Sequence, residues 1–271
     1  MPVEIVARSL AFINWVVLAS LSVGSLAAIL LLTLRAESTR GYRGFAVFAS
    51  GGWAFLAWLA DGALPLPPAG APISAAPAEI DAGRRLLLVL VASLSIVWTL
   101  RIAAGGDGRR IGGITVVGGV GALLLGAAGW GATPLLTVAL AAQLLLLAAV
   151  TGTAFAAMVL AHWYLVTPKL PEAPLLLLSR ALGAGVVVQI TLFLVWQFMG
   201  LGGLGSGWDF FAILRLTIGL VFPALLTYAG WRTAKSRSME SATGLLYIDL
   251  GAVATGTILA AGLFFGAGIL V

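Results

Sequence analysis

The apolar segments of this chain contain four ionisable side chains that could do chemistry, namely His162, Arg180, Arg215 and Asp249. A charge is costly to place inside a membrane, so an ionisable residue in such a segment is by default a candidate for a functional site. An imidazole beside a carboxylate and a phenol can donate a hydrogen bond on one side and exchange a proton on the other. That chemistry suits the carbonyl of a quinone or an acidic lipid head group.

Helix geometry brings two of these residues to the same depth. Arg180 and Asp249 are each expected about six residues, or roughly 9 Å, into helices that begin on the same side of the membrane. His162 is expected close to the end of a helix that reaches that side. The predicted ligand-binding residues are His162, Tyr164, Arg180, Tyr247 and Asp249, with the hydroxyl of Ser179 beside them.

Two interpretations of this layer stay open. In the first, Arg180 and Asp249 form a buried ion pair that only holds two helices together, and His162 is a hydrated residue at the interface. In the second, the five residues form a pocket at the cytoplasmic leaflet that holds a ligand head group or relays protons. Arg215 lies toward the other side, where we expect its side chain to reach the outer interface or to pair with Asp209.

The elements that must position these residues are apolar runs. Of the 271 residues, 61% are hydrophobic and 9% are charged, whereas soluble domains carry roughly 25% charged residues. A bilayer crossing takes about 20 apolar residues, and the runs cover residues 10–34, 45–60, 86–104, 111–130, 134–166, 175–201, 210–231 and 244–271. The sequence therefore predicts an all-α integral membrane protein, a bundle of about eight transmembrane helices in a single domain over residues 1–271.

Basic residues predict the orientation of this bundle. Ten of them fall in one set of connections and three in the other, and cytoplasmic loops are the ones enriched in Lys and Arg. The larger set is Arg35, Arg40, Arg43, Arg101, Arg109, Arg110, Lys169, Arg232, Lys235 and Arg237, and the smaller is Arg8, Arg84 and Arg85. We therefore expect both termini on the non-cytoplasmic side, in the inner membrane of a prokaryote.

Two further patterns concern the connections and the packing of helices. Residues 61–83 are rich in Pro and Ala and predict an external loop, for which a linker, a small lid and a docking surface are all open. Small residues at every fourth position, Gly118, Ala122 and Gly126, predict a face where membrane helices approach closely.

Composition excludes several functions. The absence of Cys removes disulfides, thiolate nucleophiles and iron–sulfur ligation, and the single histidine rules out a dihaem or haem–copper site. A single haem is disfavoured, because Met158 lies one turn from His162 on the same helix and cannot be the opposing ligand. No lysine lies inside a late helix to bind retinal, no phosphate-binding loop is present, and the scattered basic residues do not form a nucleic-acid-binding patch.

The likeness to known proteins is limited to two features. The number of runs and the stretch Trp130–Thr153, in which Trp-Gly-Ala-Thr-Pro precedes a leucine-rich helix, resemble the cofactor-free, quinone-interacting membrane subunits of bacterial molybdopterin and iron–sulfur oxidoreductases. These features do not assign the chain to that family. The expected function is a membrane subunit or anchor of a larger redox complex, with no covalently bound cofactor, a quinone or lipid site, and partners that are other membrane subunits and the bilayer. A small-solute transporter or channel is the alternative.

Overall fold

The structure is a computed structural model that describes residues 3–67, 71–167 and 170–271, with side chains from residue 9 onward. Every regular element in these ranges is helical. The elements are α1 (Val3–Arg35), α2 (Arg40–Asp61), α3 (Ala78–Ala103), α4 (Arg109–Trp130), α5 (Pro134–Val166), α6 (Ala173–Phe198), α7 (Asp209–Leu216), the π-helical turn η1 (Thr217–Val221), α8 (Phe222–Lys235) and α9 (Met239–Ala267). Lys169 and residues 68–70 of the predicted loop lie outside the described residues, as does the side chain of Arg8.

Eight helical units in the described chain are long and apolar enough to cross a membrane, with α7, η1 and α8 forming one continuous unit. This confirms the predicted all-α class and the number of runs. The connection after α2 is shorter than the predicted loop over residues 61–83, because α2 continues to Asp61 and α3 begins at Ala78. Glu79 and Asp81 lie in the first turn of α3, where negative charge favours the helix dipole.

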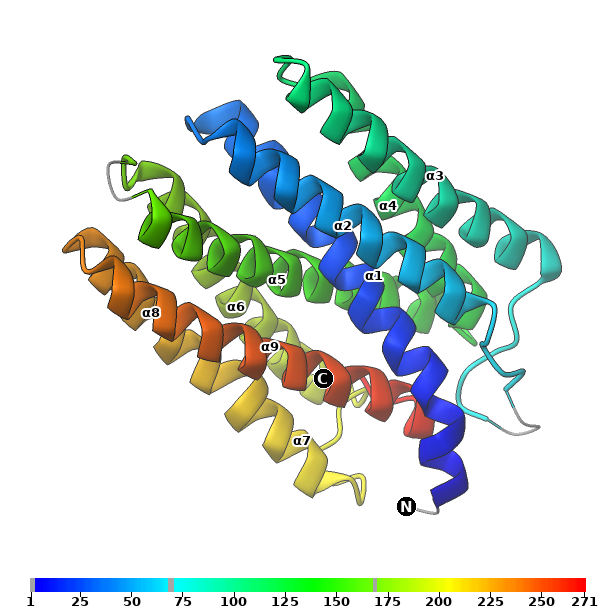
Figure 1. Cartoon of the computed structure of the whole chain (residues 1–271). Coiled ribbons are helices and arrows are strands. Elements are labelled where there is room, and N and C mark those ends of the chain that lie inside the picture. The colour runs from blue at the N-terminus through cyan, green and yellow to red at the C-terminus, as the bar shows by residue number, and fades with distance from the viewer. Residues whose placement is uncertain (1–2, 68–70, 168–169) are drawn as a thin grey trace.

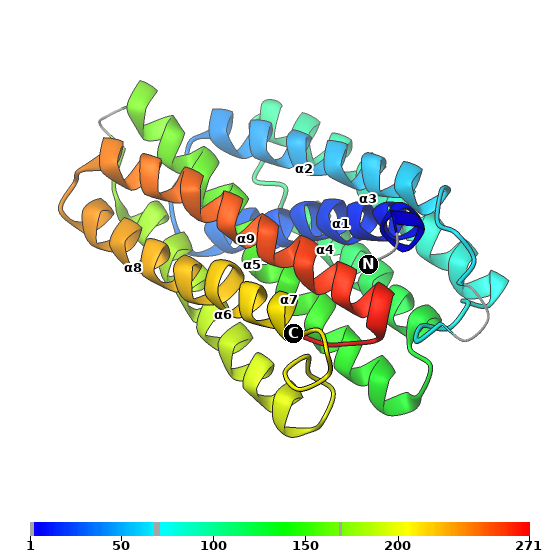
Figure 2. The same cartoon turned by 90° about the horizontal axis from the view of Figure 1, so that it is seen from below.

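The helices run side by side, and their connections gather at two ends (Figure 1). We call the basic end the one that carries the α1–α2, α3–α4, α5–α6 and α8–α9 connections, with Arg40, Arg109 and Lys235 among its residues. The opposite end carries the start of α1 and the α2–α3, α4–α5 and α6–α7 connections. Figures 1 and 2 show α1 and α5 between two groups of helices, α2, α3 and α4 on one side and α6, α8 and α9 on the other.

Glycines set the distance between the two central helices. A Cβ atom placed on Gly24 of α1 would lie 1.7 Å from the main-chain oxygen of Ala148 of α5. A Cβ atom on Gly152 of α5 would lie 2.1 Å from the main-chain nitrogen of Ser25. Backbones that touch in this way gain van der Waals contact, which is the main attraction between helices in lipid.

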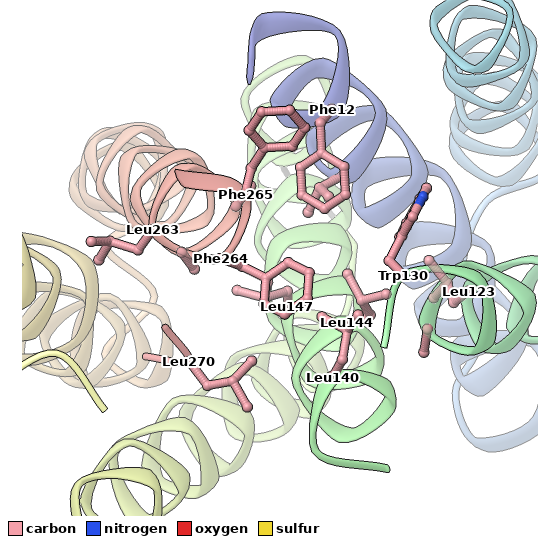
Figure 3. Close-up of a cluster of buried hydrophobic side chains, with 14 of the residues drawn as sticks. Phe12, Leu123, Trp130, Leu140, Leu144, Leu147, Leu263, Phe264, Phe265 and Leu270 are labelled. Carbon is pink, nitrogen blue, oxygen red and sulfur yellow. The ribbon is translucent and has the colours of Figure 1, made fainter. Parts of the chain in front are cut away.

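Aromatic and leucine side chains fill the bundle toward the opposite end. Figure 3 shows Phe12 of α1 between Trp130 of α4 and Phe265 of α9. The ring centroids of Phe12 and Trp130 are 4.8 Å apart, and those of Phe12 and Phe265 are 5.4 Å apart. Leu140, Leu144 and Leu147 of α5 lie beneath these rings in the same cluster (Figure 3). This cluster joins α1, α4, α5 and α9.

Candidate functional site

The structure brings two of the predicted site residues together at the basic end. His162 of α5 and Tyr247 of α9 are 85 residues apart in the chain, and the Nδ1 atom of His162 lies 3.4 Å from the hydroxyl oxygen of Tyr247. Their rings meet edge to face with centroids 6.3 Å apart. His162 is exposed and Tyr247 is 48% exposed. The pair therefore offers a hydroxyl and an imidazole on the outer surface of the seam between α5 and α9.

A pocket of about 570 Å³ lies near this pair, toward the basic end. It is lined by Tyr164, Leu165, Arg237, Ser238, Met239 and Glu240. Leu165 is three residues after His162, so the two share a face of α5. Glu240 is seven residues before Tyr247, so these two share a face of α9. The pocket and the pair therefore lie along one seam.

Tyr164 has a different role from the one predicted for it. Its side chain is 1% exposed, and its hydroxyl donates a hydrogen bond to the main-chain oxygen of Pro171. That bond holds the end of α5 against the connection to α6. On the same side of the pocket, Arg237 forms an ion pair of 2.9 Å with Glu172. Tyr164 thus lines the pocket while its hydroxyl is already occupied.

The predicted ion pair between Arg180 and Asp249 is wrong. No ion pair joins them in the described part of the chain, and Arg180 is exposed on α6. The two residues also differ in depth, since Asp249 is ten residues into α9, or about 15 Å, and Arg180 is seven residues into α6, or about 10 Å. In addition, α8 packs against both α6 and α9 and separates them.

Asp249 lies in a separate buried position. It is fully buried, and its Oδ2 atom accepts a hydrogen bond of 2.6 Å from the hydroxyl of Thr227 of α8. Its Oδ1 atom has no hydrogen-bond partner among the described residues. Tyr247 is two residues away on the same helix and exposed, which places the two side chains on different faces of α9. The five predicted residues therefore do not form one pocket.

Arg215 does not reach the outer interface and does not pair with Asp209. Its side chain is 2% exposed, and it donates to the main-chain oxygen of Gly219 at 2.8 Å and to the amide oxygen of Gln189 at 3.3 Å. Asp209 instead accepts a hydrogen bond of 2.6 Å from the main-chain nitrogen of Gly205.

Proline explains why a carbonyl is available to Arg215. Pro223 has no N–H to donate to the carbonyl of Gly219 four residues earlier. The chain widens there into the π turn Thr217–Val221, in which the Phe222 N–H bonds the carbonyl of Thr217. Proline and π turns commonly interrupt membrane helices where another donor satisfies the freed carbonyl. Here that donor is the Arg215 guanidinium.

Gln143 and Val271 complete the surroundings of Arg215. The main-chain nitrogen of Val271 donates to the Gln143 amide oxygen at 3.0 Å, and the main-chain oxygen of Val271 lies 3.5 Å from the Nε atom of Arg215. These residues, with Trp196 and others, line a small void of about 10 Å³. A void of this size holds about one water molecule.

A second arginine, Arg84, is also buried, although its position in the sequence indicated only the orientation of the bundle. Arg84 of α3 is 2% exposed and contacts Asp61 of α2 through Nε at 2.6 Å and Nη2 at 3.2 Å. Its guanidinium carbon lies 4.6 Å from the ring centroid of Trp130 and 5.7 Å from that of Trp15. The available signal was an acidic residue at the end of one helix and a basic residue at the start of the next, since consecutive antiparallel helices place those ends together.

Metal ligation and known families give no further guidance. Within the described residues, no three His, Asp or Glu side chains are grouped so that they could hold a metal ion. A comparison of the sequence with models of protein families and with curated proteins finds no match. A functional proposal therefore has to rest on the fold and on the geometry of these side chains.

Proposed function

We propose that this chain is a membrane subunit of a larger respiratory or redox complex and that it binds a quinone head group at the His162–Tyr247 pair. The observation that carries the proposal is the 3.4 Å approach of the His162 Nδ1 atom to the Tyr247 hydroxyl, on a surface where both residues are exposed. A surface that faces lipid is where a quinone would enter from the bilayer.

The chemistry of the pair favours a carbonyl over an acidic lipid head group. A phenol is a hydrogen-bond donor and an imidazole can donate or accept a proton, so both suit an uncharged carbonyl oxygen. Among the described residues that line the neighbouring pocket the cation is Arg237, and it is engaged by Glu172 at 2.9 Å. A bound quinone would supply two-electron chemistry, with electrons delivered by a partner subunit. His162 and Tyr247 would orient its carbonyl and exchange protons at their ring nitrogen and hydroxyl.

Binding of a short-chain quinone tests this site. Decylubiquinone is titrated against the purified protein, and its quenching of tryptophan fluorescence reports binding, since Trp163 is adjacent to His162. Loss of one hydrogen bond should weaken binding about 3- to 10-fold in Tyr247→Phe and in His162→Phe. Tyr228→Phe is the matched control, because Tyr228 is 58% exposed on α8 and has no hydrogen bond in the described structure. Equal affinity in all four proteins would overturn the proposal.

The orientation proposed with this function has the basic end in the cytoplasm, and its support is the distribution of Lys and Arg. Single cysteines at Asp107, in the α3–α4 connection, and at Ala132, in the α4–α5 connection, test it. In intact cells an impermeant thiol reagent should label position 132 and leave position 107 unmodified. The reverse pattern would invert the orientation.

A small-solute transporter is the competing function, and the specific observation in its favour is the buried polar group around Arg215, Gln189 and Gln143. The void there, about 10 Å³, is too small for more than about one water molecule. Solubilisation in mild detergent separates the two functions. Co-purification with cofactor-bearing subunits supports the redox complex, whereas a solitary protein that moves a solute into liposomes supports the transporter.

A further inference from the structure

A second region of the molecule, on helices other than those that carry the His162–Tyr247 pair, has an open apolar groove. A groove of about 360 Å³ runs between α2 and α3. Its floor contains Gly51, Gly52 and Ala92, and its walls include Phe55 and Ile96, which are 49% and 53% exposed. The groove opens to the outside of the bundle, where the bilayer would lie.

The groove exists because two adjacent glycines have different surroundings. A Cβ atom on Gly51 would lie 2.7 Å from the Cβ atom of Ser95, so α2 and α3 approach closely at that position. A Cβ atom on Gly52 would meet nothing within 4 Å. The first glycine draws the helices together, and the second leaves the space between their outer faces unfilled.

A cation, Arg85, lies beside Trp58 at one end of the groove. Arg85, Val89, Ala92 and Ile96 are spaced by four, three and four residues, which places them on one face of α3. The Arg85 guanidinium carbon lies 5.6 Å from the ring centroid of Trp58, which also lines the groove. Tryptophan and arginine at the end of a membrane helix are typical of the head-group level.

The guanidinium of Arg85 forms no hydrogen bond within the described residues. Its Nη1 atom is 3.8 Å from an oxygen of Asp61, beyond hydrogen-bonding distance, because Asp61 is bonded to Arg84. The side chain of Arg85 is 38% exposed. A guanidinium with unused N–H groups matches the paired oxygens of a phosphate.

We propose that the groove between α2 and α3 binds one anionic phospholipid, with an acyl chain over Gly51 and Gly52 and the phosphate on Arg85. The distance along α3 from Arg85 to Ile96 is eleven residues, or roughly 16 Å, which is about half of the ~30 Å hydrocarbon thickness. The groove therefore has the length of one leaflet. The charge at its end favours a lipid with net negative charge over a zwitterionic one.

Native mass spectrometry with two lipids tests the proposal. The protein in mild detergent is mixed with equal amounts of phosphatidylglycerol and phosphatidylethanolamine that carry identical acyl chains. One bound phosphatidylglycerol per chain is expected, in about tenfold preference over phosphatidylethanolamine. Arg85→Gln should abolish this preference, and Arg85→Lys should keep part of it because the charge remains. Equal retention of the two lipids by the unmodified protein would overturn the assignment to an anionic lipid.

A pair of glycine variants tests the groove itself. Gly52→Leu adds a side chain whose Cβ atom meets nothing within 4 Å, and it should reduce the bound phosphatidylglycerol about tenfold. Gly251→Leu is the matched control, because Gly251 of α9 is also exposed with nothing within 4 Å of an added Cβ atom. Thermal unfolding of both variants checks that they are folded. The groove is not the lipid site if Gly52→Leu retains the lipid. It is a contact between two copies of the chain, and not a lipid site, if the unmodified protein is a dimer and Gly52→Leu makes it a monomer.

Discussion

Two arginines that are buried in the described part of the chain have different kinds of partner. Arg84 and Arg215 are each 2% exposed and each six residues after the start of a helix that begins at the opposite end, a depth of about 9 Å. Arg84 is held by Asp61 at 2.6 Å, by Asp81 at 2.8 Å and by the faces of two tryptophans. Arg215 has no Asp or Glu carboxylate within 4 Å in the described chain and bonds to amide and main-chain oxygens.

The comparison shows two kinds of partner that can stabilise a buried guanidinium in a chain of this kind. An opposite charge and aromatic faces offset the cost of dehydrating Arg84. For Arg215 the cost of dehydration is offset by the carbonyl of Gly219, which Pro223 leaves without its usual N–H donor. The partner of Arg215 is therefore a backbone group of the same helical unit. Removing Arg84 leaves the side-chain carboxylate of Asp61 without its partner, whereas removing Arg215 leaves no Asp or Glu side chain of the described chain without one. That contrast predicts unequal effects of the same substitution.

The largest effect is expected for Arg84→Met. The Asp61 side chain, 1% exposed, would be left with Arg85 at 3.8 Å as its nearest cation. Breaking a buried pair costs about 3–5 kcal/mol, which unfolding in mixed detergent micelles would measure. Arg110→Met is the control, because Arg110 is exposed and should change stability by no more than about 0.5 kcal/mol. A cost below that of an exposed ion pair would show that the pair contributes little.

Removing both partners sharpens the interpretation. The double variant Asp61→Leu/Arg84→Met leaves no buried charge at this contact, so it should lose less stability than the sum of the single variants. We expect a coupling energy of about 1–3 kcal/mol from the double-mutant cycle. A coupling near zero would mean that the tryptophan contacts of Arg84, and not Asp61, account for the cost of the single substitution.

Arg215→Met is expected to cost less, about 1–2 kcal/mol, because it leaves unpaired only hydrogen-bond acceptors that are not Asp or Glu carboxylates. Adding Gln189→Leu should recover part of this loss, since one unsatisfied buried oxygen is then removed with its partner. The same micelle unfolding measures both variants. If Arg215→Met proves as costly as Arg84→Met, the distinction between the two arrangements fails.

The helices were predictable from the sequence because apolar runs report directly on membrane crossing. His162 and Tyr247 could also be grouped from the sequence, since both were expected at a similar depth near the same end of the bundle. Which helices pack together could not be predicted from the sequence. The backbones of Gly24 and Gly152 touch, but nothing in the sequence around these glycines distinguishes them from Gly118 and Gly126.

Two residues show why charges were harder to place than helices. The predicted depth of Asp249 assumed a helix that begins at Gly244, whereas polar residues from Met239 onward are helical, which moves Asp249 by more than one turn. Arg84 was counted as part of a loop, although the first turn of α3 includes Glu79 and Asp81. In both cases polar residues extend a helix beyond its apolar run, and the run alone gives the wrong register.

Within the described residues, Asp249 is a buried acidic residue without a charged partner, as Arg215 is a buried basic one. Its substitution is expected to have the smallest effect on stability. It has a hydroxyl partner, Thr227 at 2.6 Å, and no cation within 4 Å in the described structure. Asp249→Asn keeps an acceptor for that hydroxyl and removes the charge, so stability should change by no more than about 1 kcal/mol. Arg180→Gln, on an exposed side chain, should add to it within about 0.5 kcal/mol, as independent sites do. A coupling energy above about 1 kcal/mol in this cycle would mean that the two charges interact after all. In that case the separation of α6 from α9 by α8 would not hold in the membrane.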